Sequence, residues 1–520
     1  MGREVELKLQ VPSSAVDEVA RLPWLSEVTN GQAKREKLVT VYFDTPKSKH
    51  RKHGLVLRIR HSGSNRLQTI KALQKGACGS FGRNEWEERI AGDKPILKLA
   101  KGTALEPLAT KKLQRKLKPV FATVVERAAF PIRSGEADLE LAVDHGHIEA
   151  RESREPVSEI EIELKHGDRS AIATIAERLA QSVPVAYMAQ SKPERGYALS
   201  AGQAAKAVCR STIDLDPEAF TAVAFQTIAL SCLDHAAANE TAVREGDTEG
   251  VHQMRVGLRR LRAAISIFKE LLPGPETKAV KTELKWLTEQ LGPARDLDVL
   301  LEQRVNKEPR IPPIGSDIDL LEADLQARRD AGLQKAKATV DGDRYRSLGL
   351  CTALWVTNGE WSKSAEPLTV ARRERRAVEF AAEILDKRSK KISKKIEYIE
   401  NLDARQRHKA RIAVKKLRYA CEFFVGLFDG RKQIRERKRF ASILKSLQGS
   451  LGALNDIEVH KRLAATIAHP RKLSRKHAER ALAMGFIAGQ EQQQVASCIA
   501  TAEKTGKQLS NSAKFWQRRR

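Results

Sequence analysis

Up to about residue 200, apolar and polar residues mostly alternate along the chain, and turn-forming segments separate the alternating runs. Successive side chains of a β-strand point to opposite faces, so this pattern predicts strands with one apolar and one polar face. We expect strands at residues 5–11, 38–43, 55–60, 67–73, 139–143 and 160–165. Helical spacing appears in the same part of the chain at residues 14–22 and 168–181.

After Asp216-Pro217 the apolar positions recur every three or four residues almost to the end, which is typical of helices. This part of the chain repeats itself, because residues 252–262 return as 408–418 and Leu291-Gly292 returns as Leu451-Gly452. In each copy a histidine and three basic residues follow one another at spacings of three, four and three, so they share one helix face. These basic stripes are His252, Arg255, Arg259 and Arg262, and His408, Arg411, Lys415 and Arg418. Agreement across two separated blocks indicates an internal duplication.

The change of spacing divides the chain into parts of different class, so the predicted fold class is α+β. A chain of 520 residues is long enough for more than one domain. We expect a β domain over residues 1–205, a linker over 206–217 and an all-α domain over 218–510. Its two repeats would span about 218–305 and 372–465.

Several predicted strands carry charged side chains on one face. Glu4, Glu6 and Lys8 alternate with aliphatic residues, and the same pattern recurs at Arg58 and Arg60, at Glu85 and Glu87, and at Glu159, Glu161 and Glu163. Unpaired charges are too costly to bury in a dry core. We interpret the strands as the wall of a hydrated tunnel for a metal-bound polyanion. The alternative is a set of ordinary sheet faces that water covers.

The net charge of the chain favours anionic binding partners but does not identify which one. Lys and Arg exceed Asp and Glu by 27, and most of that excess follows residue 200. Such a field attracts nucleic acid, polyphosphate or an anionic membrane surface. Aromatic residues make up 5% of the chain and offer few stacking platforms for single strands, which argues against nucleic acid. Without an apolar signal segment or a spanning stretch, we expect no membrane partner and a cytoplasmic protein.

The first 200 residues resemble the CYTH domain, the triphosphate tunnel metalloenzyme family, which is marked by Glu-x-Glu-x-Lys on the first strand. Glu4-x-Glu6-x-Lys8 is that pattern here. The other matching segments follow in order: Tyr42-Phe43-Asp44-Thr45-Pro46, Leu57-Arg58-Ile59-Arg60, Lys71, Arg83-Asn84-Glu85-Trp86-Glu87, Arg127, Asp144-His145-Gly146, Glu159-Ile160-Glu161 and Ser191-Lys192-x-x-Arg195-Gly196-Tyr197. The resemblance implies an eight-stranded antiparallel β-tunnel that acts on triphosphates with a divalent metal.

The resemblance also implies roles for single residues, and the chemistry suits them. Guanidinium and ammonium groups grip phosphate oxygens, whereas carboxylates hold Mg²⁺ or Mn²⁺. The implied substrate-binding residues are Arg58, Arg60, Lys71, Arg127 and Lys192, and the implied metal ligands are Glu4, Glu6, Asp144, Glu159 and Glu161. Glu4, Glu6 and Lys8 are the candidate catalytic residues, and Lys8 could bind a phosphate or tune the attacking water. Glu85, Glu87 and Glu163 are second-rank candidates that could equally form structural ion pairs.

The helical part resembles the CHAD domain, a duplicated helical bundle family associated with inorganic polyphosphate. The two basic stripes and the two Leu-Gly segments carry this resemblance over residues 218–465. The resemblance implies that both stripes bind polyphosphate. Two alternatives remain open, namely that the basic residues form solvated helix faces and that the histidines are interior hydrogen-bonding residues. The second repeat has Lys415 where the first has Arg259, so the two bundles are not expected to grip phosphate equally.

Together these patterns predict an enzyme, a hydrolase of phosphoric anhydrides that cleaves tripolyphosphate to pyrophosphate and phosphate with Mg²⁺ or Mn²⁺. The helical domain would bind long-chain polyphosphate and could bring the enzyme to polyphosphate granules. The alternatives are a polyphosphate-binding scaffold with a weakly active CYTH domain, and a CYTH enzyme that acts as an adenylate cyclase or a thiamine triphosphatase. A homodimer is left open.

Overall fold

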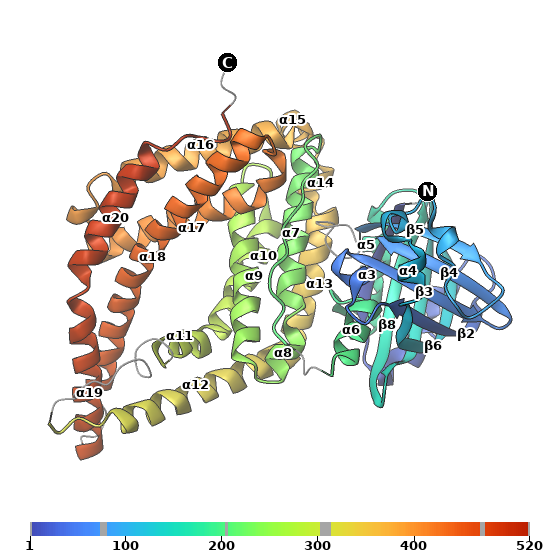
Figure 1. Ribbon diagram of the computed structural model, residues 1–520, viewed down its shortest axis with the longest axis horizontal. Helices are drawn as coiled ribbons and strands as arrows, with labels where there is room; N and C mark the ends of the chain where they lie inside the picture. The colour runs from blue at the N-terminus through green and yellow to red at the C-terminus, as the bar shows by residue number, and fades with distance from the viewer. Residues whose placement is uncertain (1–2, 73–80, 203–205, 302–313, 469–473, 518–520) are drawn as a thin grey trace.

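The computed structural model describes residues 3–72, 81–202, 206–301, 314–468 and 474–517. It does not describe the side chains of residues 3, 4, 81–84, 295, 296 and 299. A sheet domain at one end adjoins a larger array of helices, and α18 to α20 lie farthest from the sheet (Figure 1). The predicted α+β class, with an antiparallel sheet before a helical domain, is confirmed.

Strands β1 to β8 alternate in direction around a closed sheet, because β5 at one end of the strand order also pairs with β1. Within the described residues the sheet has nine strands, so the predicted count of eight is wrong. The extra strand is the two-residue β9, which pairs with Leu9 and Gln10 beyond the short stretch of β1 that pairs with β5. The strands are β1 Arg3–Gln10, β2 Lys34–Asp44, β3 Leu55–Ser62, β4 Asn65–Ala72, β5 Phe81–Arg89, β6 Lys118–Ser134, β7 Ala137–Ala150, β8 Ser153–His166 and β9 Ala186–Tyr187.

Apolar side chains cover the outer face of this sheet on two sides. On β1, β7 and β8 they pack against α5, with Leu7, Leu141 and Ile162 at most 1% exposed. On β2 to β5 they pack under the connection between β5 and β6. The short helices are α1 Val16–Val19, α2 Pro23–Val28, α3 Lys49–Lys52 and α4 Lys111–Gln114, and the longer ones are α5 Ser170–Ser182 and α6 Lys192–Ser200. The helix predicted at 14–22 is instead a 3-10 turn followed by α1, and Pro23 starts a new helix.

Helix α6 closes one end of the lumen. Tyr42 and Phe121 are paired in the register of β2 and β6, and their rings stack with centroids 4.3 Å apart. Tyr197 of α6 packs edge-on against Phe121, and its hydroxyl donates to the buried Asp44 carboxylate at 3.0 Å. Gly196 allows this approach, because a β-carbon there would lie 2.2 Å from the Phe121 ring. An aromatic plug therefore fills the lumen at this end.

Both copies of the repeated sequence form helices of 20 residues, α9 Thr248–Ile267 and α17 Ala404–Phe423. In the first repeat Pro293 follows a break between α10 and α11, whereas in the second repeat the same region continues through Ala453 in one helix of 38 residues, α18. The remaining helices are α7 Thr221–Ala237, α8 Glu240–Arg244, α10 Pro275–Gln290, α11 Gly292–Leu300, α12 Ile318–Asp341, α13 Asp343–Asn358, α14 Glu360–Lys363, α15 Pro367–Glu374, α16 Ala377–Ile396, α18 Arg431–Ala468, α19 Arg475–Gln492 and α20 Val495–Ser510. Among the described helices, none combines the length and the apolar character that crossing a bilayer would require.

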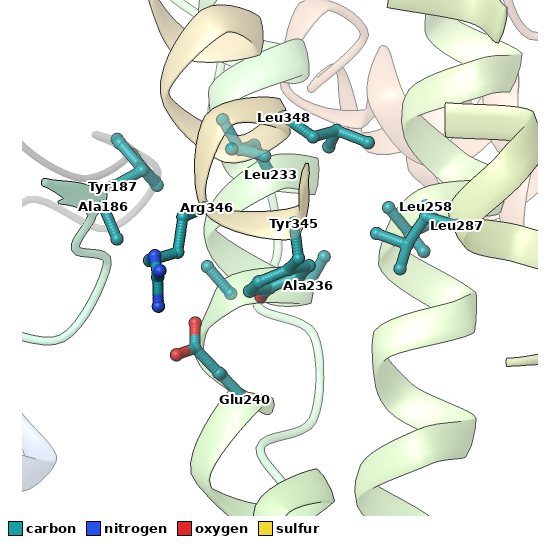
Figure 2. A pocket seen from close by; sticks show the side chains of 12 residues that line it. Ala186, Tyr187, Leu233, Ala236, Glu240, Leu258, Leu287, Tyr345, Arg346 and Leu348 are labelled. Carbon is teal, nitrogen blue, oxygen red and sulfur yellow. The ribbon is translucent and has the colours of Figure 1, made fainter. Parts of the chain in front are cut away.

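The two domains share one apolar core. Side chains of α5 and β9 pack in the same cluster as those of α7 and α13. Figure 2 shows this interface, where Tyr187 of β9 faces Leu233 of α7 and Leu348 of α13. The cavity between them is about 20 Å³, which holds little more than one water molecule. The tightness of this packing indicates that the domains are fixed relative to each other.

Replacing Gly196 with Ala should destabilise the sheet domain by about 1–3 kcal/mol, because the added methyl group must displace the stacked Phe121 ring. The measurement is urea unfolding of the full-length chain. Gly92→Ala is the matched control, since no atom lies within 4 Å of a β-carbon at that position. Equal stability of the two variants would show that α6 does not seal the lumen as described.

Candidate functional site

Three carboxylates converge inside the closed sheet. Asp144 on β7 and Glu159 on β8 are cross-strand partners, and Glu161 lies two positions farther along β8 on the same face. One carboxylate oxygen from each lies within 4.8 Å of the others. Asp144 and Glu159 are at most 1% exposed. The alternation of β8 thus places both of its glutamates in the lumen, and its pairing with β7 adds the aspartate.

Basic side chains from three other elements neutralise these carboxylates. The Lys192 ammonium at the start of α6 lies among all three, 2.7 Å from Asp144 and 3.2 Å from Glu161 and in contact with Glu159. Arg127 of β6 donates two hydrogen bonds to Asp144, at 2.7 and 2.6 Å, and one to Glu161 at 2.7 Å. Lys8 of β1 donates to Glu161 at 2.5 Å.

Glu6 and Arg195 complete this charged cluster. Glu6, which is 5% exposed, pairs with Lys8 at 3.1 Å, and Arg195 reaches Glu159 at 3.5 Å. With Glu155, which pairs with Arg195, the described part of the cluster comprises five carboxylates (Glu6, Asp144, Glu155, Glu159, Glu161) and four cations (Lys8, Arg127, Lys192, Arg195). The cluster is therefore close to neutral.

The pKa shifts in the cluster reflect this pairing. Burial alone would raise the pKa of Glu161, but Lys192, Lys8 and Arg127 outweigh it and hold that pKa well below its usual value. Burial alone would lower the pKa of Lys8, whereas Glu161 and Glu6 raise it above the ordinary lysine value. Both groups are consequently charged at neutral pH, and each depends on the other's charge.

The donor set fits a hard divalent cation. Mg²⁺ and Mn²⁺ prefer oxygen ligands, and three carboxylates within reach of one point supply them. The Lys192 ammonium shows that this point accepts positive charge, because it contacts all three carboxylates. Asp144, Glu159 and Glu161 are thus the residues that could hold a metal.

A second group of cations lies farther along the lumen. Arg58 on β3 and Lys71 on β4 both pair with Glu85 on β5, at 3.1 and 2.9 Å. Arg60 lies two positions from Arg58, and among the described residues its buried Nε has no hydrogen-bond partner. Repulsion from Arg58, then burial, and then Arg127 lower the pKa of Arg60. Glu87 and Tyr42 oppose this shift without cancelling it, so Arg60 is held in a net cationic surrounding.

Arg60 and Arg127 also line a cavity of about 480 Å³ at the end of the lumen opposite α6. Exposed side chains at the start of β2 and the end of β5, Lys34 and Arg89, form its rim. No described lining residue is aromatic. The cavity gives a small anion a route from water to the charged cluster.

The structure places the predicted tunnel residues as follows. The predicted ligands Asp144, Glu159 and Glu161 are together, and Glu6 joins them through Lys8 rather than directly. The side chain of Glu4 lies outside the described residues, so its predicted role stays a prediction. The second-rank Glu85, Glu87 and Glu163 each have a protein partner, namely Arg58 with Lys71, Thr69 and Lys165.

Sequence reasoning assigned no role to Arg195, and it assigned Lys192 to the substrate alone. Arg195 pairs with Glu155 at 2.7 Å as well as with Glu159. Its position one helical turn after Lys192 was the available signal, because residues three apart share a helix face. In this structure Lys192 and Arg195 both neutralise Glu159 of β8.

The two basic stripes of the helical domain come together. The packing of α9 against α17 places the Arg260 guanidinium 5.4 Å from the Phe423 ring centre, and Lys416 donates to Ser266 at 3.1 Å. Burial, and then Arg411, Arg259 and Arg418, outweigh Asp456 and lower the pKa of Lys415 to about 7. Because Arg259 belongs to the first repeat, the stripes form one shared cationic surface.

Stripe residues of the second repeat also have polar partners, and Arg418 lies 3.7 Å from the Glu422 carboxylate. Arg411 and Asp456 lie 4.0 Å apart, and His408 Nδ1 lies 2.7 Å from the Asn455 side-chain oxygen. His408 is exposed, so this hydrogen bond does not support the alternative of an interior histidine. All eight stripe residues lie on α9 or α17, and their role in binding polyphosphate stays a prediction.

Comparisons with known protein families agree with this division of the chain. The profile of the CYTH domain matches residues 2–197, and the profile of the CHAD domain matches residues 227–465. An inorganic triphosphatase of Haemophilus influenzae is 29% identical over 205 residues. The match covers 39% of this chain and 56% of that relative, so the chain spans little more than half of its length.

Solved structures add to the comparison for the helical domain. The crystal structure of the CHAD domain from the plant Ricinus communis is 31% identical, with a TM-score of 0.50, and covers 59% of this chain and 98% of its own. A Hippeastrum protein with a dominant triphosphatase activity is 18% identical, with a TM-score of 0.30, over 39% of this chain and 97% of its own. The second likeness is too weak to support an argument.

Replacing Lys192 with Met should lower the free energy of unfolding by about 3 kcal/mol, because three converging carboxylates lose a neutralising charge. Millimolar Mg²⁺ or Mn²⁺ should raise the thermal midpoint of this variant more than that of the wild type. NaCl at equal ionic strength is the control in both proteins. A variant that gains no more from the divalent cation than from NaCl would contradict the assignment of these carboxylates as a metal site.

Proposed function

This chain belongs to the proteins in which a CYTH domain is followed by a CHAD domain, and from that premise we propose that it is a metal-dependent inorganic triphosphatase. It would hydrolyse tripolyphosphate to pyrophosphate and phosphate in the lumen of the sheet domain. The observation that carries the proposal is the convergence of Asp144, Glu159 and Glu161 with Arg127 in a lumen that also holds Arg58 and Arg60.

Charge balance supports a metal and an anion that bind together. The cluster is close to neutral as it stands, so a divalent cation alone would leave it with uncompensated positive charge. Arg60 adds another positive charge, because repulsion by Arg58 and Arg127 together with burial outweighs the attraction of Glu87 and Tyr42. A tripolyphosphate carries enough negative charge to balance all of them. The metal and the substrate should therefore bind more tightly together than either binds alone.

The residues of the lumen would divide the work by charge. Asp144, Glu159 and Glu161 would hold the cation, which supplies positive charge and an activated water when it is bound. Arg60 and Arg127 would grip phosphate oxygens as planar forks. Arg58 and Lys71 would assist Arg60 and Arg127 in binding these oxygens. Lys8 and Lys192 would bind the phosphate group nearest the carboxylates. Glu6, together with Glu4 two positions before it, would orient the attacking water.

The shape of the lumen favours an inorganic chain of phosphates. The cavity at the open end has no described aromatic residue on which a nucleobase or a thiazole ring could stack. Trp86, the aromatic residue of the motif on β5, packs in the outer apolar layer, as its alternation with Glu85 and Glu87 predicts. Because the aromatic plug beside α6 closes one end of the lumen, a linear chain of phosphates would enter from the opposite end, with one terminal phosphate leading.

The shared surface of α9 and α17 would bind long-chain polyphosphate. Burial and then repulsion by Arg411 and Arg259 lower the pKa of Lys415, and cations that repel one another gain free energy when a polyanion joins them. Binding there would bring the substrate pool close to the sheet domain and would place the protein at polyphosphate granules in the cell.

A phosphate-release screen tests the proposed activity. Linear tripolyphosphate, cyclic trimetaphosphate, ATP and thiamine triphosphate are each offered with Mg²⁺ or Mn²⁺ to the full-length chain. We expect fast release from the linear inorganic substrate and little from the cyclic one. Turnover of ATP or thiamine triphosphate above that of tripolyphosphate would favour the alternative enzymes.

A pair of variants separates the enzyme from a polyphosphate scaffold. Glu6→Gln should abolish turnover and spare polyphosphate retention, whereas Arg255→Glu with Arg411→Glu should do the reverse. A wild-type chain that retains polyphosphate but does not hydrolyse tripolyphosphate with either metal would favour the scaffold.

Replacing Arg60 with Gln should raise the KM for tripolyphosphate about tenfold to hundredfold, the value of a charge-assisted hydrogen bond. The same change should stabilise the protein and raise its free energy of unfolding by about 0.5–2 kcal/mol. The reason is that the Arg60 guanidinium, which Arg58 and Arg127 repel in the folded state, is no longer present. Arg58→Gln is the matched control, since it also weakens binding but breaks the pair with Glu85 and should destabilise. An Arg60 variant that is less stable than the wild type would show that this guanidinium is not strained.

The affinity of the helical domain for polyphosphate should fall as the pH rises through 7. Lys415 is charged below its pKa of about 7 and neutral above it, so its attraction for phosphate fades in that range. A contact of about 1 kcal/mol corresponds to a loss of about fivefold in affinity. Binding is measured at pH 6 and pH 8.5 at constant ionic strength. Lys415→Arg, which stays charged, is the control and should lose less, so equal losses would contradict the assignment.

A further inference from the structure

One short segment, residues 186–192, contacts both the wall of the tunnel and the helical domain. We propose that Tyr187, which the helical domain holds through Asp234, is a positioning residue for Lys192 in the tunnel. The inference rests on the proposed function and extends it, because it makes the CHAD domain a determinant of tunnel geometry.

The first part of the segment lies along the strand that carries Glu6 and Lys8. Residues Ala186 and Tyr187 form β9 and pair with Leu9 and Gln10 of β1. The next amide, that of Met188, donates to the Lys8 carbonyl at 3.1 Å. The backbone of the segment is thus part of the tunnel wall beside the charged cluster.

The side chains of the same segment bind the helical domain. The Tyr187 hydroxyl donates to the Asp234 carboxylate on α7, and its ring is 5% exposed in the core that the two domains share. The Gln190 side-chain amide donates to the Ala238 carbonyl after the end of α7, at 3.3 Å. A hydrogen bond to a carboxylate is stronger than a neutral one, so the Tyr187 contact should dominate.

The last part of the segment delivers Lys192 to the carboxylates. Ser191 caps α6 in a capping box with Glu194. The Ser191 amide and hydroxyl both donate to the Glu194 carboxylate, at 2.8 and 2.7 Å. Lys192 is the first residue of that helix and follows Tyr187 by five positions. Because the backbone is held by hydrogen bonds at β9 and at the cap of α6, the segment between Tyr187 and Lys192 has little conformational freedom.

The contacts of the segment have a direct consequence for the charged cluster. A shift of α7 relative to the sheet would move Tyr187, and the segment would pass that movement to Lys192 rather than absorb it. The Lys192 ammonium contacts Asp144, Glu159 and Glu161, so its position decides how those carboxylates meet a cation or a phosphate.

A double-mutant cycle in the full-length chain tests the inference. Tyr187→Phe keeps the ring in the core and removes the hydroxyl, and Asp234→Asn weakens the same bond from the side of the helical domain. Each is combined with Lys192→Met, and both kcat/KM for tripolyphosphate and its calorimetric Kd with Mn²⁺ are measured. We expect each single change to reduce kcat/KM and affinity about fivefold in the wild-type background and to have no further effect beside Lys192→Met.

Tyr345→Phe is the control for general damage to the interface. Tyr345 lines the same interdomain cavity (Figure 2). Its hydroxyl hydrogen-bonds to Glu240 rather than to the segment. It should leave kcat/KM and Kd unchanged.

The outcomes separate this inference from the proposed function. Wild-type kinetics and affinity in Tyr187→Phe, or losses of equal size with and without Lys192, would overturn the inference. A wild-type chain that binds tripolyphosphate without hydrolysing it would overturn the proposed function, and the Kd cycle would still decide the positioning role. A chain that does not bind tripolyphosphate would contradict both.

Discussion

A closed sheet can carry charged side chains on its inner face only if those charges neutralise one another, and the rest of this structure depends on that requirement. Asp144, Glu159 and Glu161 share the lumen because Lys192, Arg127 and Lys8 share it with them. The balance is close but not complete, since repulsion of Arg60 by Arg58 and Arg127, together with burial, outweighs its attraction to Glu87 and Tyr42. A site that is neutral at one end and cationic at the other is suited to a metal-bound polyanion.

Clustered charges are also a feature of the helical domain, which is joined to the sheet domain. In the helical domain, cations of both repeats meet on α9 and α17, and burial together with repulsion by Arg411, Arg259 and Arg418 lowers the pKa of Lys415. The domains are joined by a common apolar core and by the segment from Tyr187 to Lys192. One domain would gather polyphosphate and the other would act on its short relatives, in a fixed spatial relation.

Much of this architecture could be predicted from the sequence, because strands and helices have different spacings. The alternation of Glu159, Glu161 and Glu163 identified the charged face of β8, and the repeated stripes identified α9 and α17. The 17-residue β6 was not predicted, since its apolar residues run together and Pro131 interrupts the pattern. The contacts of Lys192 and the extra strand β9 could not be predicted either, because they arise from pairing between segments far apart in the chain.

The central claim is that one lumen binds a divalent cation and a chain of phosphates side by side. The most direct measurement is anomalous X-ray diffraction from crystals grown with Mn²⁺ and a non-hydrolysable imido analogue of tripolyphosphate. We expect a manganese peak bounded by Asp144, Glu159 and Glu161, with phosphate density against Arg60 and Arg127. Manganese and phosphate found only on the outer surface, with the Lys192 ammonium still among the three carboxylates, would contradict it.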